Sequence, residues 1–358
     1  MSTREQDDRL DKLRAEGKKL YSISRLNTME QCQYQAYMRY VEKKPQKNIG
    51  IYGALGECCH SLIEDCIHDE NKSPSELKDI INNKLDDLEI TGVEFPKDRN
   101  GGTSIRDNWL NNIVRFSEEF ATPQGNFETE QLLFYKVDED HYMMGYADAI
   151  CHQDDGSVWL IDWKTSSQFD KAHLLSAGRQ LVLYKLALEE LGYTVSKCSW
   201  CMLKYCETSW TLKNGKTKTK VSEWRNLIKD MKNNIEKDLD ALGYDEMDIE
   251  IMLDKGITSN SWSSFPQEVQ DKYTTAVYYR DYEITDEIIE ETKSYINRII
   301  GQYESLGEDG NNYSPCNIDK NSYFCNALCG YGGKSCQCKY YADYCDQFSK
   351  DDNEEDLF

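Results

Sequence analysis

The alternation of apolar and polar residues predicts a pair of β-strands near the middle of the chain. Residues 140–151 and 157–164 are rich in aromatic and β-branched residues, and HQDDG at 152–156 between them is typical of a turn. Side chains of a strand alternate between its two faces, so Asp162 and Lys164 point the same way while their neighbours point into a core. The pattern predicts a hairpin with one polar face.

Apolar residues at helical spacing predict several helices around this hairpin. A helix that begins near Ala172 should end at Gly192, a glycine suited to the position after a helix end. Asn27, followed by Glu30, predicts the start of an early helix that Pro45 stops. Further helices are expected at 53–65, 222–243 and 284–307.

The polar face of the hairpin carries residues suited to phosphodiester hydrolysis. Asp148 can face Asp162 across the strand pair, and two carboxylates aimed at one point bind a hard divalent cation. Such a cation lowers the pKa of a bound water and neutralises charge on a phosphate. Lys164 could orient that water or stabilise the developing negative charge. The alternative is two surface aspartates and a solvated lysine on an antiparallel sheet.

The helix after the hairpin adds two candidate catalytic residues. Gln180 and Tyr184 are four residues apart and therefore share a helix face. Following an Asp-x-Lys strand, they could hydrogen-bond a phosphate or a base near the metal. The predicted catalytic residues are thus Asp148, Asp162, Lys164, Gln180 and Tyr184.

This order of motifs resembles the PD-(D/E)XK nucleases, and specifically their RecB-like branch. The resemblance rests on GYAD at 145–148, IDWKT at 161–165 and Gln180 with Tyr184. It implies an α/β fold with a restriction-endonuclease-like mixed sheet flanked by helices, a helical cap and a cysteine-rich C-terminal tail. It also implies DNA hydrolysis that depends on Mg²⁺ or Mn²⁺.

The resemblance extends upstream to GALGECCHSLIED at 53–65. It implies that His60 is a metal ligand together with Asp148 and Asp162, with Glu64 one turn further on the same helix face. An acidic residue is also expected on the strand at 127–137. Glu130 matches that position, but Glu128 has the same strand parity, so both remain candidates.

The cysteines suggest a second metal centre. Six of the fourteen cysteines lie between Cys316 and the C-terminus, and the charged N-terminus lacks a secretory signal, so bound metal is favoured over disulfides. Cys198 and Cys201 lie in a strand-like segment at odd spacing, which sends the two thiols to opposite faces as packing residues.

The resemblance, which here includes AddB-like and CRISPR-associated exonucleases, implies a [4Fe–4S] cluster with one cysteine before the nuclease core and three after it. The tail departs from the family's compact C-x₂-C-x₅-C pattern. The expected ligands are Cys32, Cys345 and two from Cys329, Cys336 and Cys338, which leaves Cys316 and Cys325 unassigned. A zinc site built from the C-terminal cysteines alone is the alternative.

The net charge of −22 requires a DNA-binding surface to be local. The turn at Asn214-Gly215 predicts a hairpin at 209–221, whose lysines Lys213, Lys216, Lys218 and Lys220 are either DNA contacts or merely solvated. Residues 349–358 form an acidic end that is expected to be disordered and either without a role, inhibitory or a docking tip.

Together these features predict a single nuclease domain at 1–348, with a helical insertion at 222–283 and a cluster-binding tail at 316–345 that closes on the N-terminal helix. The expected function is a metal-dependent DNA exonuclease, acting on single-stranded or unwound ends in recombination, repair or replication. A helicase or a single-strand-binding protein is a possible partner. The expected location is the reducing cytoplasm, without a membrane. The alternatives are a non-catalytic iron–sulfur or zinc nucleic-acid-binding subunit and a cluster-dependent redox or regulatory protein.

Overall fold

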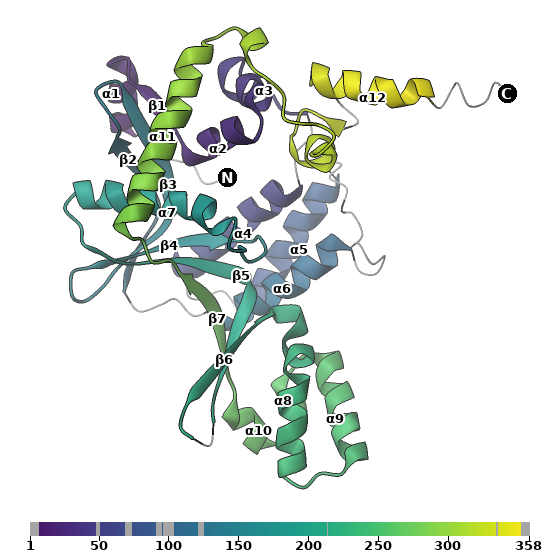
Figure 1. Ribbon diagram of the computed structural model, residues 1–358. Helices are drawn as coiled ribbons and strands as arrows, with labels where there is room; N and C mark the ends of the chain where they lie inside the picture. The colour runs from purple at the N-terminus through teal and green to yellow at the C-terminus, as the bar shows by residue number, and fades with distance from the viewer. Residues whose placement is uncertain are drawn as a thin grey trace, which may run out of the picture.

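The computed structural model has a seven-stranded mixed sheet with helices on both faces (Figure 1). This is the α/β architecture that the sequence predicts. The structure describes residues 7–47, 51–68, 74–90, 95, 104–120, 125–212, 214–333 and 336–351.

Strand β3 (His141–His152) organises the sheet and creates a fork in it. One edge of β3 pairs along most of its length with antiparallel β2 (Asn126–Lys136). The other edge pairs at its start with parallel β1 (Lys19–Tyr21) and at its end with antiparallel β4 (Val158–Lys164). Residues 144–148 of β3 lie between these two pairings, so the sheet opens there.

Strand β5 (Val195–Thr211) carries the sheet into a separate lobe. Its first half is parallel to β4, and its second half pairs with β6 (Thr217–Glu223). Strand β7 (Thr274–Asp281) is antiparallel to β5 and pairs with residues of both halves. Helices α8, α9 and α10 cover this ribbon at the bottom of Figure 1 and span Leu227–Ala241, Glu246–Ser259 and Gln267–Lys272. The segment 222–283 therefore contains a strand of the main sheet as well as helices, and that strand was not predicted.

Two hydrophobic cores lie on the two faces of the sheet. Leu160 belongs to the core beneath α2 (Ile23–Gln31), α7 (Leu174–Glu190) and α11 (Asp286–Leu306). Ile161, the next residue along β4, belongs to the core on the other face. That second core is covered by α4 (Ile51–His68), α5 (Pro74–Ile90), α6 (Ile105–Glu119) and α8. Cys198 and Cys201 likewise fall in opposite cores, as predicted.

Most predicted elements are confirmed. Helix α7 ends just before Gly192, whose φ of 91° closes the helix, and Gly215 at φ 79° occupies the predicted hairpin turn. The remaining elements are helices α1 (Asp8–Ala15), α3 (Gln33–Ala36) and α12 (Lys339–Asp351), π-helical turns at Tyr37–Val41 and Phe324–Leu328, and 3₁₀ turns at Trp224–Asn226, Trp262–Ser264 and Gly310–Asn312.

The prediction of one helix capped at Asn27 is wrong. Ser22 caps α2 by accepting a hydrogen bond from the Arg25 amide at 3.2 Å, while Asn27 lies inside the helix. The helix stops at Cys32, which is extended (φ −159°, ψ 108°), before α3 begins. The break frees the amide of Tyr34 to donate to the Ser314 carbonyl at 2.9 Å, a tertiary contact that the local pattern does not contain.

Three further features bear on the predictions. Lys220 donates to the backbone of Asp230 in α8, so at least one hairpin lysine is engaged inside the lobe. Lys213 and the acidic end from residue 352 lie outside the described residues. No helix in the described part of the chain is both long enough and apolar enough to cross a bilayer.

Candidate active site

The predicted carboxylates lie at the fork of the sheet, and both are buried. Asp148 on β3 accepts a hydrogen bond from the Trp163 amide of β4 at 2.7 Å. Asp148 is 6% exposed and Asp162 only 1%. Burial, and then the nearby Asp162 carboxylate, raise the pKa of Asp148 well above its ordinary value. Two buried carboxylates that interact in this way are unfavourable when no cation compensates their negative charge.

Asp162 has only part of its charge compensated within the chain. Its Oδ2 lies 2.6 Å from Lys164 Nζ, whereas its buried Oδ1 has no hydrogen-bond partner among the described residues. Burial lowers the pKa of Lys164, but Asp162 and Asp148 outweigh burial and raise it, so the side chain stays an ammonium. A buried carboxylate oxygen without a partner is costly, and a bound cation would satisfy it.

Gln180 and Tyr184 extend the polar chain from Lys164 into α7. Lys164 Nζ donates to Gln180 Oε1 at 3.2 Å, and Gln180 Nε2 donates to the Tyr184 hydroxyl at 3.0 Å. Burial raises the pKa of Tyr184, which therefore remains a neutral phenol. In this arrangement Gln180 and Tyr184 hold Lys164 in place.

His60 reaches the same point from α4 on the opposite face of the sheet. Its Nδ1 lies 3.6 Å from Asp148 Oδ1, and its Nε2 lies 3.2 Å from the Trp163 carbonyl. Burial lowers the pKa of His60, which favours the neutral ring. A ring that donates Nε2–H to that carbonyl turns its Nδ1 lone pair toward Asp148, and such a second hydrogen bond typically orients a metal ligand.

Glu130 on β2 completes a cluster of possible metal ligands. Donor atoms of His60, Glu130 and Asp148 all lie within 4.8 Å of one another. Glu130 has φ 51°, an unfavourable value for a residue other than glycine and one that often occurs at functional sites. The other candidate, Glu128, instead lies 3.0 Å from His152 Nε2. Oxygen donors with one imidazole suit Mg²⁺ or Mn²⁺, so the residues fit a divalent cation.

A cleft of about 400 Å³ opens above this cluster. The cluster, Gln180 and Tyr184 line one part of it. Gly145 and Tyr146 of the predicted GYAD motif line another part. The remaining wall was not predicted, because its residues come together only through the packing of α2 and α7 on β3 and carry no spacing signal. These residues are Ser22, Ile23, Ser24, Met144 and Leu183.

The cysteines that lie close together are not the same set that the sequence predicts as cluster ligands. The thiols that line one small cavity belong to Cys32, Cys316, Cys325, Cys329 and Cys338. Cys316 donates its amide to Cys32 Sγ at 3.4 Å, and the Cys316 and Cys325 sulfurs lie 3.6 Å apart. Cys336 and Cys345 are exposed and do not line this cavity, although the sequence analysis included both.

The comparison with family models identifies the chain. The model of the PD-(D/E)XK nuclease superfamily matches residues 21–304, a range that contains every residue of the cleft. The chain belongs to the PD-(D/E)XK nuclease superfamily. The cysteines from Cys316 onward lie beyond the matched range of this nuclease.

Two other comparisons add little. A search of curated proteins gave no match. A solved structure titled "Crystal structure of SSO0001" is similar at 15% identity, over 65% of the nuclease and 88% of that chain, with a TM-score of 0.19.

Proposed function

We propose that this nuclease is a DNA exonuclease that uses Mg²⁺ or Mn²⁺ and acts on single-stranded or unwound ends in recombination, repair or replication. The observation that carries the proposal is the cluster of His60, Glu130 and Asp148 beside Asp162 Oδ1, which has no hydrogen-bond partner in the described part of the chain. This set offers a divalent cation nitrogen and oxygen donors next to a cationic lysine.

Each residue has a distinct part in the proposed reaction. When bound, a divalent cation neutralises the phosphate and promotes ionisation of the attacking water. Asp148 and Asp162, with His60, would hold the cation, and Glu130 would add a further oxygen donor. Lys164 keeps its positive charge and would stabilise the negative charge that develops on the phosphate. Gln180 fixes the direction of the Lys164 side chain from α7.

The size of the cleft supports a single-stranded substrate. Its volume of about 400 Å³ lies near the low end of the range for small-molecule pockets, about 300–1,000 Å³. A pocket of this size can hold one nucleotide but not a base-paired segment. Such a nuclease would depend on a helicase or a single-strand-binding protein to supply an unwound end. None of the described cysteines is part of a disulfide, which agrees with the proposed reducing, cytoplasmic location.

The cysteine cavity is proposed to hold a [4Fe–4S] cluster, bound by Cys32 and three of Cys316, Cys325, Cys329 and Cys338. Four sulfurs around a tetrahedral zinc at 2.3 Å would lie about 3.8 Å apart. Cys316 and Cys325 meet that spacing, but no third thiol among the described residues lies within 4.8 Å of both. The wider spread supports a larger group than a single zinc ion, which remains the alternative.

A cleavage assay tests the proposed function. Purified protein is incubated with end-labelled single-stranded and duplex DNA in Mg²⁺, Mn²⁺ or EDTA. We expect metal-dependent release of short products from the single strand. Asp162→Ala should abolish cleavage without unfolding the protein, and Lys164→Ala should reduce it about 10²-fold or more.

Asp154→Ala is the matched control, because Asp154 is an exposed aspartate in the turn between β3 and β4. It should cleave like the parent protein. Residual cleavage of more than a few per cent by Asp162→Ala would reject the site. DNA binding without any cleavage by the parent protein would favour a non-catalytic nucleic-acid-binding subunit.

A further inference from the structure

A second pocket shares a wall with the catalytic cleft. It has a volume of about 390 Å³ and is lined by residues of β1, α2 and α11. Along one segment of the chain, Lys19, Tyr21 and Arg25 line this pocket, whereas Ser22 and Ser24 line the cleft. The same short segment, residues 19–25, therefore lines both the pocket and the cleft.

The pocket is cationic on an otherwise acidic protein. Three cations line it, Lys19, Arg25 and Lys43, against two carboxylates, Glu304 and Glu308. The whole chain has a net charge of −22. A local excess of positive charge in such a protein favours an anionic ligand at this position.

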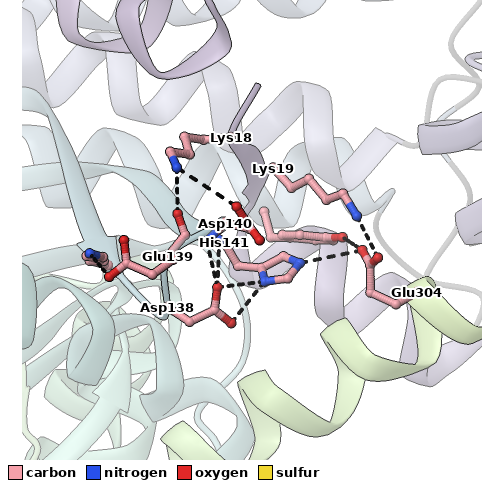
Figure 2. A network of polar contacts seen from close by, with 9 residues as sticks. Lys18, Lys19, Asp138, Glu139, Asp140, His141 and Glu304 are labelled. Atoms are coloured by element: carbon pink, nitrogen blue, oxygen red, sulfur yellow. Dashed lines mark hydrogen bonds and ion pairs between the residues drawn. The ribbon is translucent and has the colours of Figure 1, made fainter. Parts of the chain in front are cut away.

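The charge of Glu304 is already compensated by its neighbours. Figure 2 shows Lys19 and His141 converging on it, with Lys19 Nζ 2.5 Å from Glu304 Oε2 and His141 Nε2 3.6 Å from Oε1. The Tyr21 hydroxyl donates to Glu304 Oε1 at 3.2 Å. Glu304 is thereby held by β1 and β3, and the positive charges of Arg25 and Lys43 face the pocket.

Arg25 is fixed in position by aromatic rings. Its guanidinium carbon lies 4.4 Å from the Tyr21 ring centroid and 4.7 Å from that of Tyr303, and Nη1 donates to the Leu20 carbonyl at 3.0 Å. Its buried Nε has no hydrogen-bond partner among the described residues. The side chain is preorganised while part of its donor capacity is unused.

Tyr40 gives the pocket an aromatic wall beside these cations. Its ring is half-buried and lies 5.4 Å from the Arg25 guanidinium and 5.3 Å from that of Arg39. Lys43 is exposed at the rim. Cations beside an aromatic ring are the combination that binds single-stranded nucleic acid, because cations contact phosphates and rings contact bases.

We propose that this pocket, which we call the tyrosine–cation pocket and define by Lys19, Tyr21, Arg25, Tyr40 and Lys43, binds one nucleotide. Its phosphate contacts Arg25 and Lys43, and its sugar or base lies against Tyr40. The proposal rests on the proposed nuclease function, since the nucleotide belongs to the strand whose neighbouring segment enters the cleft. A free nucleotide has the same chemistry and is distinguished by experiment.

A salt titration tests the phosphate contact. Affinity of a labelled single-stranded oligonucleotide is measured by fluorescence anisotropy in EDTA, so that the readout does not depend on cleavage. Lys43→Ala should weaken binding at least fivefold at low salt and reduce the slope of log K against log salt by about 0.7, the value for one phosphate contact on a single strand. Lys229→Ala, which removes an exposed lysine of α8, is the matched control and should change neither quantity.

Abasic substitution tests the contact with Tyr40. Tyr40→Leu keeps an apolar side chain but removes the ring, and should weaken binding about tenfold. If a base stacks on Tyr40, one abasic position in the oligonucleotide should cost little in this variant and about tenfold in the parent. Equal losses at every position in both proteins would overturn the stacking contact.

A competition experiment distinguishes a nucleotide of the DNA strand from a free nucleotide. If longer oligonucleotides displace the labelled oligonucleotide and dAMP does not, the pocket binds the DNA strand. If dAMP displaces it, longer oligonucleotides do not, and Lys43→Ala removes the effect of dAMP, the pocket binds a free nucleotide. Unchanged affinity and unchanged salt slope in Lys43→Ala and Tyr40→Leu would overturn the proposal. Cleavage by the parent protein tests the nuclease function separately.

Discussion

Asp148 and Asp162 show how a proposed catalytic site can oppose the stability of its own fold. Both carboxylates are buried at the fork of the sheet, and the Lys164 ammonium compensates only part of their charge. Ionised groups at such a position are costly in the absence of a cation. Metal binding and folding stability should therefore be linked at these residues.

Asp148→Asn should stabilise the metal-free protein at alkaline pH. Because burial and Asp162 raise the pKa of Asp148, its protonated form stabilises the fold below the unfolded pKa of about 3.9, and this contribution is lost as pH rises through the higher folded pKa. Asparagine can still accept from the Trp163 amide and does not ionise. In EDTA at pH 8 we expect a Tm about 2–4 °C above that of the parent, with the difference shrinking toward pH 4.

Saturating Mg²⁺ provides the control for this prediction. The cation should raise the Tm of the parent and leave Asp148→Asn nearly unchanged, because only the parent has the full set of ligands. A parent protein that melts at or above the variant in EDTA at pH 8 would contradict the expected cost of the buried charge.

The residues of the site differ in how far the sequence could predict them. Asp162 and Lys164 were predictable because a strand places alternate residues on one face, and the same alternation puts Ile161 in the opposite core. The choice between Glu128 and Glu130 could not be predicted, because both have the same strand parity. The place of Glu130 in the cluster with His60 and Asp148, and the His152 partner of Glu128, favour Glu130, and neither follows from local pattern.

At the scale of elements, the packing of α7 against β3 controls the position of Lys164. A Cβ at Gly145 would lie 2.6 Å from Cε1 and 2.7 Å from the hydroxyl of Tyr184, which is only 5% exposed. Gly145 therefore lets α7 approach the strand closely enough for Gln180 to reach Lys164.

Gly145→Ala should displace Tyr184 and weaken both stability and cleavage. We expect a loss of about 1–3 kcal/mol, as for other overpacked sites, and at least a tenfold fall in kcat with little change in metal affinity. Chemical denaturation and single-turnover kinetics measure the two effects. Combining the change with Tyr184→Ala should cost less stability than the sum of the single losses, because the clash is gone.

Gly301→Ala in α11 is the matched control, since a Cβ there meets nothing within 4 Å. It should stabilise the helix by about 0.5–1 kcal/mol. A Gly145→Ala protein with normal stability and kcat would show that α7 can shift without consequence, against the proposed role of this contact.

Elements whose form depends on distant partners were the ones that the sequence misassigned. The stretch around Cys32 has helical spacing throughout, yet the helix breaks there, and the break lets the Tyr34 amide pair with Ser314 near the other end of the chain. Strand β7 was missed because it lies between helices and becomes a strand by pairing with β5. In contrast, α7 and α11 carry both their apolar stripe and their end signals locally, and both were predicted.

At the scale of the whole molecule, the two ends of the chain pack against each other. Gln35 Nε2 donates to the Cys329 carbonyl at 2.8 Å, and the Tyr331 hydroxyl donates to the Lys44 carbonyl at 2.8 Å. Cys32 and Cys316 meet in the same region. A metal cluster shared between these segments would close nearly the whole chain into one loop and so restrict the unfolded state.

The cysteine set therefore gives a test of the whole-molecule arrangement. Cys32→Ala and Cys316→Ala should each bleach the brown colour of anaerobically purified protein, lower its iron content and reduce its Tm, because both thiols line the cavity. Cys336→Ala and Cys345→Ala should keep colour, iron and Tm, because these two thiols are exposed and lie outside the cavity lining. Absorption in the visible blue from thiolate–iron charge transfer and metal analysis are the measurements.

The outcomes distinguish three arrangements of the tail. Loss of iron in Cys345→Ala with retention in Cys316→Ala would favour the ligand set expected from the family resemblance, and would require the tail to move relative to this structure. Colourless parent protein with stoichiometric zinc would favour a zinc site. Loss of iron in Cys32→Ala and Cys316→Ala alone would tie the ligands to the fold itself, since the contact between Cys32 and Cys316 exists only once the C-terminal segment has packed on α2 and α3.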